Sequence, residues 1–264
     1  MKKTNLIESP SGKYKKIFPH FNAISTTSPR KYVRRTDMPS PLPTPHALRP
    51  ELIPTILATN ERQFKSRAMI MEGTAHTVQV DIMDGTFVPG VTWDHPEVVR
   101  EWGLDLAFEL HCMVDDPLPI IDRWRKVRGF KRAIIHAEIP ENIGTILARI
   151  RKHKIETGLA ICPGTPLSVV ANHLKQLDMV LVMGGKPGGV AQPMDRRTIQ
   201  TARELRKLFP HLHIGFDIGV TRSTIPTLVR AGVTRLCAGH AIFRTPSPIK
   251  AYKELDQLAQ KAVK

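Results

Sequence analysis

The chain has 264 residues, of which 41% are hydrophobic, and a formal net charge of +15. No apolar run approaches the roughly 20 residues that a membrane-spanning helix requires, so we expect no transmembrane segment and no membrane partner. The length suits one or two domains, and single α/β barrels often reach this size.

The positive charge is concentrated at the start of the chain. Residues 1–50 contain ten lysines and arginines against Glu8 and Asp37, a net +8, together with eight of the 22 prolines. We predict a basic, Pro-rich extension, disordered or irregular, followed by a folded domain at residues 51–264. Clustered Lys and Arg attract RNA and other polyanions, which makes such a molecule the expected partner of this extension. The segment lacks the compact apolar region of a secretory signal, so a cytoplasmic location is expected, with an organellar transit peptide as the alternative.

The three cysteines, Cys112, Cys162 and Cys237, are odd in number and show no CxxC spacing. Each falls in an apolar, strand-like segment. We therefore expect reduced, packed thiols in a reducing compartment rather than disulfides or nucleophiles.

After Pro50, short β-rich runs alternate with longer amphipathic stretches. The predicted strands are Ile53–Ala58, Thr77–Ile82, Leu106–Cys112, Arg132–Ala137, Glu156–Ile161, Met179–Met183, His211–Asp217 and Thr234–Ala238. The predicted helices include Pro117–Val127, Asn142–His153, Asp195–Leu208, Ser223–Ala231 and Ser247–Ala262. The alternation predicts an α/β protein with a parallel sheet. Eight repeats without a GxGxxG loop favour a single (β/α)₈ TIM barrel over an open doubly wound sheet.

Charged and imidazole side chains fall at the ends of several predicted strands, namely Asp81, Asp84, His111, His136 and Asp217. In parallel barrels these ends meet at one mouth, where active sites are built. Carboxylates and imidazoles there suit either a divalent metal or proton transfer next to a carbonyl. The alternative is that each is a satisfied polar group at a strand end.

Glycines cluster in the late loops, at residues 184–189, at Gly219 and at Gly239, which His240 follows. Glycine lets backbone N–H groups approach a phosphate closely, and the loops after strands seven and eight commonly bind phosphate in such barrels. A sugar-phosphate ligand is therefore expected.

At these residues the sequence resembles the ribulose-phosphate 3-epimerase family, over essentially all of residues 52–250. The segment at residues 80–89, VDIMDGTFVP, is similar to the family's V-D-x-M-D-G-x-F-V-P. Further similar segments are LHCMV at 110–114, PGTP at 163–166, LVM at 181–183, DIGV at 217–220 and AGHAIF at 238–243.

The resemblance implies metal-assisted epimerisation at C3 of a ketose phosphate such as D-ribulose 5-phosphate. Asp81 and Asp217 would carry out a two-aspartate 1,1-proton transfer, while a divalent Zn, Fe, Mn or Co ion would stabilise the enediolate. The implied metal ligands are Asp81, His111 and Asp217, with Gln79 where the family usually has histidine. Since an amide oxygen is a poorer ligand than imidazole, this replacement predicts weaker metal binding.

The implied substrate-binding residues are Thr55, Met83, Met113, Met183, Gly188, Gly219, Gly239 and His240. Thr55 replaces a family serine, Ile218 replaces the glycine after Asp217, and His240 replaces the serine after Gly239. The methionines would form an apolar floor for the planar intermediate, or alternatively serve only as core filler. A homo-oligomer is also expected.

Three functions are compatible with these features. The first is an active epimerase, and the second is a catalytically degenerate epimerase-like barrel acting as a binding or scaffold protein. The third is another aldol- or isomerase-type reaction on a sugar phosphate. A Schiff-base mechanism is disfavoured because no lysine occupies a strand end, Lys186 being in a loop.

Overall fold

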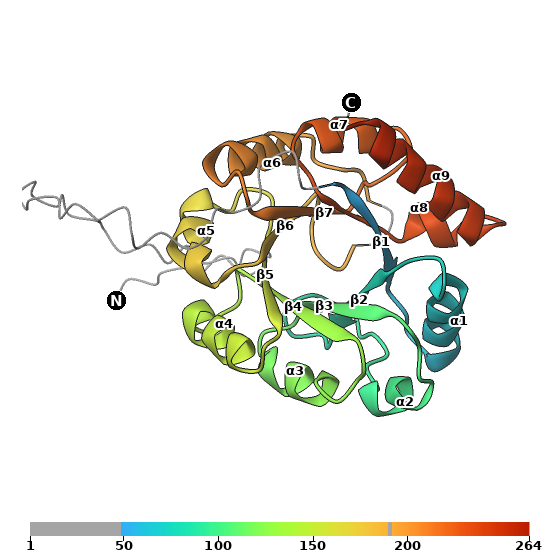
Figure 1. Ribbon diagram of the computed structural model, residues 1–264. Coiled ribbons are helices and arrows are strands. Elements are labelled where there is room, and N and C mark those ends of the chain that lie inside the picture. Colours follow the sequence, from blue (N-terminus) through green and yellow to red (C-terminus); the bar gives the residue numbers. More distant parts are fainter. Residues whose placement is uncertain (1–48, 190–191, 264) are drawn as a thin grey trace, which may run out of the picture. The chain divides into compact units, whose positions relative to one another are not determined.

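Eight parallel strands close into a barrel in the computed structural model, and helices surround the ring (Figure 1). The structure describes residues 49–189 and 192–263. The strands are β1 (Glu51–Ile56), β2 (Thr77–Met83), β3 (Ala107–Met113), β4 (Phe130–His136), β5 (Glu156–Ile161), β6 (Met179–Met183), β7 (His213–Asp217) and β8 (Arg235–Ala238). Each strand pairs in parallel with its neighbours, and β8 pairs with β1. The predicted (β/α)₈ barrel is confirmed.

The α-helices lie outside the barrel, one in each connection between successive strands and two after the last strand (Figure 1). They are α1 (Glu61–Met71), α2 (Pro96–Glu101), α3 (Leu118–Trp124), α4 (Ile143–Lys152), α5 (Leu167–His173), α6 (Arg197–Leu208), α7 (Ile225–Arg230), α8 (His240–Phe243) and α9 (Pro248–Lys261). Asparagine caps begin two of them: Asn60 Oδ1 accepts from the Gln63 amide at 3.0 Å, and Asn142 Oδ1 accepts from Thr145 at 2.9 Å. These bonds satisfy N–H groups that lack a partner at a helix start. No helix in the described part of the chain combines the length and apolar character needed to cross a bilayer.

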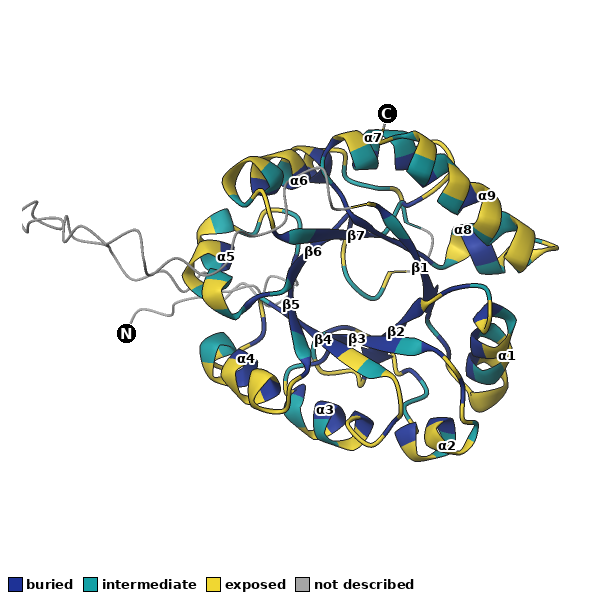
Figure 2. Cartoon of the chain, in the orientation of Figure 1, coloured by how far each residue is buried: buried dark blue, intermediate teal, exposed yellow. Residues whose placement is uncertain are grey.

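Two apolar layers stabilise the barrel, and burial follows the inner faces of the helices (Figure 2). The larger layer lies between strands and helices, because alternate strand residues point outward to meet one face of each helix. The smaller layer comprises Ile53, Ile134, Ala160, Met179, Leu181, Met183 and Cys237. Its members come from alternate residues of β1, β4, β5, β6 and β8, as expected for side chains that fill a barrel interior.

Buried ion pairs join the early parts of three strands. Glu109 of β3 accepts from Arg132 of β4 and from Arg235 of β8, both at 2.6 Å, and all three residues are buried. Each arginine also pairs with a carboxylate on another strand, Glu156 for Arg132 and Glu51 for Arg235. The Glu109–Arg235 pair links β3 with β8, two strands that are not adjacent in the sheet, and the other three pairs link neighbouring strands.

The predicted strands match the observed ones to within two residues at each end, and β5 and β6 match fully. His211 and Leu212 are not part of β7, because the Leu212 amide donates to Phe209 in a turn that follows α6. β1 ends at Ile56 rather than Ala58, whose carbonyl instead accepts from the Trp93 amide of a later loop. Helices α1, α2, α5 and α8 were not among the named helical patterns, three of them having only four to seven residues.

The basic extension predicted at residues 1–50 lies outside the described residues, apart from its last two. Pro50 is buried, and its carbonyl accepts a hydrogen bond from Gln260 Nε2 at 2.7 Å. The expected polyanion binding therefore remains a prediction about residues 1–48.

Candidate active site

Three ionisable side chains and one amide meet at the carboxyl end of the barrel. Gln79 and Asp81 point into the barrel because they are alternate residues of β2, and Asp81 lies beside His111 in the register of β2 and β3. Asp217, the last residue of β7, completes the group. His111 Nδ1 lies 3.1 Å from Asp81 Oδ1 and 3.6 Å from Asp217 Oδ2. Residues separated by 30 to 138 positions in sequence are thus brought within hydrogen-bonding range.

Gln79 bridges the two carboxylates. Its Nε2 donates to Asp81 Oδ1 and to Asp217 Oδ2, both at 2.9 Å. All these side chains are buried, so the two acids share an environment with little water. Ionising both carboxyl groups at once therefore costs free energy. Burial, followed by the charge of Asp81, raises the pKa of Asp217 to about 6. Burial alone would lower the pKa of His111, but the hydrogen bond and charge of Asp81 outweigh it and raise that pKa.

A hydrogen-bonded chain extends from His111 toward the surface. His111 Nε2 lies 2.9 Å from His136 Nε2, and His136 Nδ1 lies 3.2 Å from Glu138 Oε2. Burial lowers the pKa of His136 to about 4, so this imidazole is neutral and carries one ring proton. Although burial opposes ionisation of Glu138, hydrogen bonds from His136 and the Cys162 amide lower its pKa. The Nδ1 proton of His136 therefore faces a carboxylate, and its Nε2 accepts from His111.

Glu138 was missed in the sequence analysis, although it follows His136 by two residues at the end of a predicted strand. Its backbone lies beyond β4, but its carboxylate returns toward the barrel mouth and accepts from the Cys162 amide at 2.9 Å. Cys162 itself differs from expectation: it directly follows β5 and is half-buried, whereas Cys112 and Cys237 are buried within strands.

The Asp81, His111 and Asp217 group fits a divalent metal ion. One ligand atom from each side chain lies within 4.8 Å of the other two. Two carboxylates and one imidazole suit first-row transition metals. Gln79 presents Nε2 to this group, while its buried Oε1 has no partner among the described residues. Its amide would have to turn over before the oxygen could serve as a ligand.

A cavity of about 620 Å³ opens above Asp81 and Asp217. Four of the predicted substrate-binding residues line it, namely Thr55, Gly219, Gly239 and His240. The buried Thr55 Oγ1 has no hydrogen-bond partner in the described part of the chain, which leaves it available to a ligand hydroxyl.

Two arginines that the sequence analysis missed also line this cavity, Arg67 from α1 and Arg244 directly after α8. Arg67 donates to the Leu57 carbonyl and lies over the Phe243 ring, with 5.4 Å from its guanidinium carbon to the centroid. Burial, followed by the charge of Arg244, lowers the pKa of Arg67. Neither arginine forms an ion pair with a carboxylate within the described residues, so this wall of the cavity carries uncompensated positive charge.

The remaining predicted substrate-binding residues pack elsewhere than in the lining of the cavity. Met83 and Met113 pack with Val88, whereas Met183 belongs to the barrel interior. Gly188 has a φ of +75° and lies so close to Val88 that a Cβ would come within 3.0 Å of it. None of these four predicted residues is among the described residues that line the cavity.

Asp84, one of the five strand-end polar residues, does not join the central group. It lies beyond β2, is exposed, and accepts hydrogen bonds from the Thr86 amide and hydroxyl at 3.0 and 2.6 Å. Asp84 is therefore a loop residue whose side chain is satisfied by local hydrogen bonds, which was the alternative explanation for the polar residues at the strand ends.

Ile218 adopts a left-handed backbone conformation, with a φ of +71°. A β-branched residue is strained there, and such strain collects at functional sites. Its amide donates to Asp217 Oδ1 at 2.7 Å. The strained residue thus helps to fix the carboxylate that precedes it.

The fold and the site define a (β/α)₈ barrel whose mouth combines paired carboxylates with glycine-rich loops and two arginines. The model of the ribulose-phosphate 3-epimerase family matches residues 51–243. This chain belongs to that family.

Relatives support this assignment along most of the chain. Ribulose-phosphate 3-epimerase of Mycobacterium tuberculosis is 30% identical over 218 residues, covering 80% of this chain and 93% of the relative. Ribulose-phosphate 3-epimerase of Candida glabrata is 26% identical over 238 residues, covering 82% of this chain and 95% of the relative. Among solved structures, KGPDC from Streptococcus mutans has a TM-score of 0.65 at 13% identity, covering 81% of this chain and 99% of that one. At that identity the likeness shows a shared fold.

Proposed function

We propose that this protein epimerises a ketose phosphate such as D-ribulose 5-phosphate at C3, by proton transfer between Asp81 and Asp217. The observation that carries the proposal is the pair of buried carboxylates held by one amide at 2.9 Å each, at the base of a 620 Å³ cavity. Inversion at a carbon requires one group to take a proton from one face and another to return a proton to the opposite face.

The pair has the electrostatics for two complementary roles. One carboxylate must be ionised to remove the C3 proton, and the other must be protonated to return one. Because burial and Asp81 raise the pKa of Asp217 to about 6, Asp217 is the better initial acid and Asp81 the better initial base. After one turnover the proton is on the other carboxylate, so the same pair serves the reverse reaction.

The cavity walls provide for the rest of the substrate. Backbone N–H groups near Gly219 and Gly239 suit a phosphate, and the unpaired charges of Arg67 and Arg244 favour a dianion there. The Thr55 hydroxyl, buried without a partner among the described residues, is placed to bind a sugar hydroxyl. These features orient the sugar with its phosphate toward the loops and its carbons toward the two aspartates.

The residues that would hold a divalent Zn, Fe, Mn or Co ion are Asp81, His111 and Asp217. Gln79 would become a fourth ligand only after its amide turned over, since its Nε2 faces the carboxylates. Such an ion would polarise the substrate oxygens and stabilise negative charge that develops on them. His136 would support this site through its contact with His111 Nε2, which leaves His111 Nδ1 directed at the carboxylates.

The scaffold alternative is not favoured. The replacement of a family histidine by Gln79 first suggested it, yet Gln79 keeps both carboxylates aligned through two hydrogen bonds. A barrel that had lost catalysis would have no need of a strained Ile218 beside a buried acid.

The proposal is tested by an epimerase assay on D-ribulose 5-phosphate with the metal-supplemented full chain. Asp81→Asn and Asp217→Asn should each lower kcat by at least about 10²-fold, since each removes a proton carrier. The matched control is Asp84→Asn, which alters an exposed aspartate three residues after Asp81 and should keep activity within about twofold. Full activity in either active-site variant would refute the two-aspartate mechanism.

A further inference from the structure

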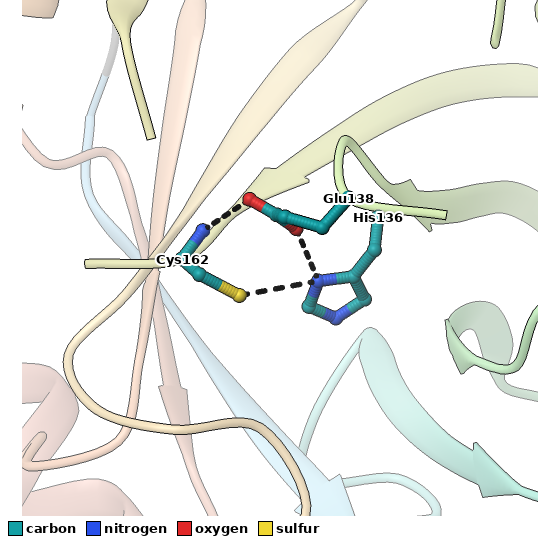
Figure 3. A group of neighbouring side chains, drawn as sticks. All are labelled: His136, Glu138 and Cys162. Carbon is teal, nitrogen blue, oxygen red and sulfur yellow. Dashed lines mark hydrogen bonds and ion pairs between the residues drawn. The ribbon is translucent and has the colours of Figure 1, made fainter. Parts of the chain in front are cut away.

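A second group of side chains that can bind a metal lies beside the active site, and the proposed epimerase chemistry involves only His136 among its three members, as a support for His111. His136 ends β4, Glu138 follows it by two residues, and Cys162 directly follows β5. Figure 3 shows the Glu138 carboxylate and the Cys162 sulfur both directed at Nδ1 of His136. The distances from that nitrogen are 3.2 Å to Glu138 Oε2 and 3.8 Å to Cys162 Sγ.

These separations fit a tetrahedral metal ion. Zinc bonds of about 2.0 Å to nitrogen or oxygen and about 2.3 Å to sulfur place tetrahedral ligands roughly 3.3 Å (N to O) and 3.5 Å (N to S) apart. All three ligand atoms here lie within 4.8 Å of one another. One ion could therefore bind all three after small side-chain adjustments.

The surroundings orient each ligand and leave the group open. Glu138 Oε1 accepts from the Cys162 amide at 2.9 Å and from the Thr165 hydroxyl, while His136 Nε2 contacts His111. Such outer contacts hold metal ligands in position. His136 is buried, but the Glu138 side chain is 27% exposed and Cys162 is half-buried. An ion can enter from this side and keep a water as its fourth ligand.

We propose that His136, Glu138 and Cys162 form a binding site for one zinc-class divalent ion, distinct from the Asp81, His111 and Asp217 group. The ligand set selects this class, because a thiolate with an imidazole suits zinc or cobalt, whereas magnesium and calcium prefer oxygen ligands alone. On binding, the Cys162 thiol releases its proton to solvent and a metal–sulfur bond forms without any redox change.

The contact between the two histidines couples this ion to the active site. His111 Nε2 and His136 Nε2 are 2.9 Å apart, a distance that accommodates one proton between them. With its Nδ1 on a metal, His136 carries its ring proton on Nε2 and donates to His111. A His111 whose Nδ1 held the active-site ion would also carry its ring proton on Nε2, so two protons would meet in a space that accommodates one. The second ion should therefore oppose the first, a consequence that rests on the proposed function.

Cobalt(II) distinguishes the two groups, because only the second contains sulfur. We expect titration of the full chain with Co²⁺ to produce thiolate-to-cobalt charge-transfer absorption in the near ultraviolet that saturates at one ion per chain. Cys162→Ser should abolish this band. Glu138→Gln should weaken the apparent affinity for Co²⁺, measured from the band, by about tenfold or more. The control is Cys237→Ser, which alters a buried cysteine of the barrel interior and should leave the band unchanged.

The absence of the band in the wild-type chain at saturating Co²⁺ would overturn the site without recourse to any variant. So would a band that is lost in Cys237→Ser and kept in Cys162→Ser.

The coupling has its own test, since excess Zn²⁺ should inhibit the wild-type epimerase and spare Cys162→Ser. Equal inhibition of both proteins would overturn the coupling and leave the site in place. The cobalt band requires no turnover, so a failure of the proposed function can be told apart from a failure of this site.

Discussion

Gln79 stands where the resemblance leads one to expect a histidine, and its hydrogen bonds suggest a physical role for the amide. A side-chain amide can donate to both carboxylates, as it does here at 2.9 Å to each, whereas a histidine ligand would direct a lone pair at a metal. The amide therefore aligns Asp81 and Asp217 without an ion. Gln79 Oε1 has no hydrogen-bond partner among the described residues, so this arrangement leaves one buried acceptor unsatisfied.

Replacing Gln79 by histidine should strengthen metal binding at the active site. To act as a metal ligand, the Gln79 amide must turn over and lose its two hydrogen bonds. An imidazole is also the stronger ligand for these metals. We expect Gln79→His to raise the affinity for Zn²⁺ or Co²⁺ at this site by at least about tenfold. The measurement is chelator competition in a Cys162→Ser background, which isolates the active site from the second group. Unchanged affinity would show that Gln79 already ligates as well as histidine.

Sequence reasoning located the central residues of the site because strand ends in a parallel barrel converge. Asp81, His111 and Asp217 were predicted on that ground, and they lie within 4.8 Å of one another. Their catalytic and metal-binding roles stay predictions. Arg67, Arg244 and Glu138 escaped notice because they lie in a helix or beyond a strand end, where periodicity carries no information on which way a side chain turns.

Among the structural elements, the strands were the most predictable and the short helices the least. β6 is a continuous apolar run, so its bounds could be predicted to the residue, and the bounds predicted for β5 match as well. By contrast, α8 has four residues and α2 six, too few to show a helical period. The end of β1 depends on a hydrogen bond from Trp93, a long-range contact that a local pattern cannot reveal.

The ion network of β3, β4 and β8 should be critical for stability. Glu109 is fully buried and accepts from both Arg132 and Arg235, which are themselves buried. Glu109→Gln would leave the two guanidinium groups facing each other without the central charge. We expect a loss of about 3–5 kcal/mol in the free energy of unfolding, measured in urea. Glu101→Gln, at an exposed position in α2, is the matched control and should change it by less than about 0.5 kcal/mol. A comparably small effect of Glu109→Gln would mean that Glu51 and Glu156 alone suffice to compensate the charges of the two buried arginines.

At the scale of the whole molecule, the barrel fold does not by itself specify the reaction. Solved barrels with TM-scores of 0.62 and 0.65 are titled as 3-hexulose-6-phosphate synthase and as KGPDC, at 12 and 13% identity. One fold hosts many chemistries through the residues at the strand ends. The reaction proposed for this chain therefore rests on its family membership and on the residues of its site.

The stability of the whole barrel should depend on pH through two buried groups of opposite sign. Burial lowers the pKa of His136 from 6.5 to about 4, so the unfolded chain binds more protons between those values and acidification destabilises the fold. Burial and Asp81 raise the pKa of Asp217 from 3.8 to about 6, so its contribution to stability increases on acidification through that window. The two effects should largely offset each other in the wild-type chain.

Variants should separate these contributions. Between pH 6.5 and 4, the metal-free His136→Gln protein should lose less unfolding free energy than wild type, and Asp217→Asn should lose more. Each difference is of order 3 kcal/mol at most, from a little over two pKa units. Urea unfolding at several pH values in the presence of a chelator provides the measurement. Parallel pH profiles for all three proteins would contradict these shifts.

The central claim is that Asp81 and Asp217 exchange the C3 proton of a ketose phosphate on opposite faces. Its most direct test is to incubate the metal-supplemented chain with D-ribulose 5-phosphate in D₂O and follow C3 by NMR. The account predicts loss of the C3 proton signal together with formation of the C3 epimer, and no epimer in Asp81→Asn or Asp217→Asn. Retention of the C3 proton during prolonged incubation with the wild-type protein would contradict it.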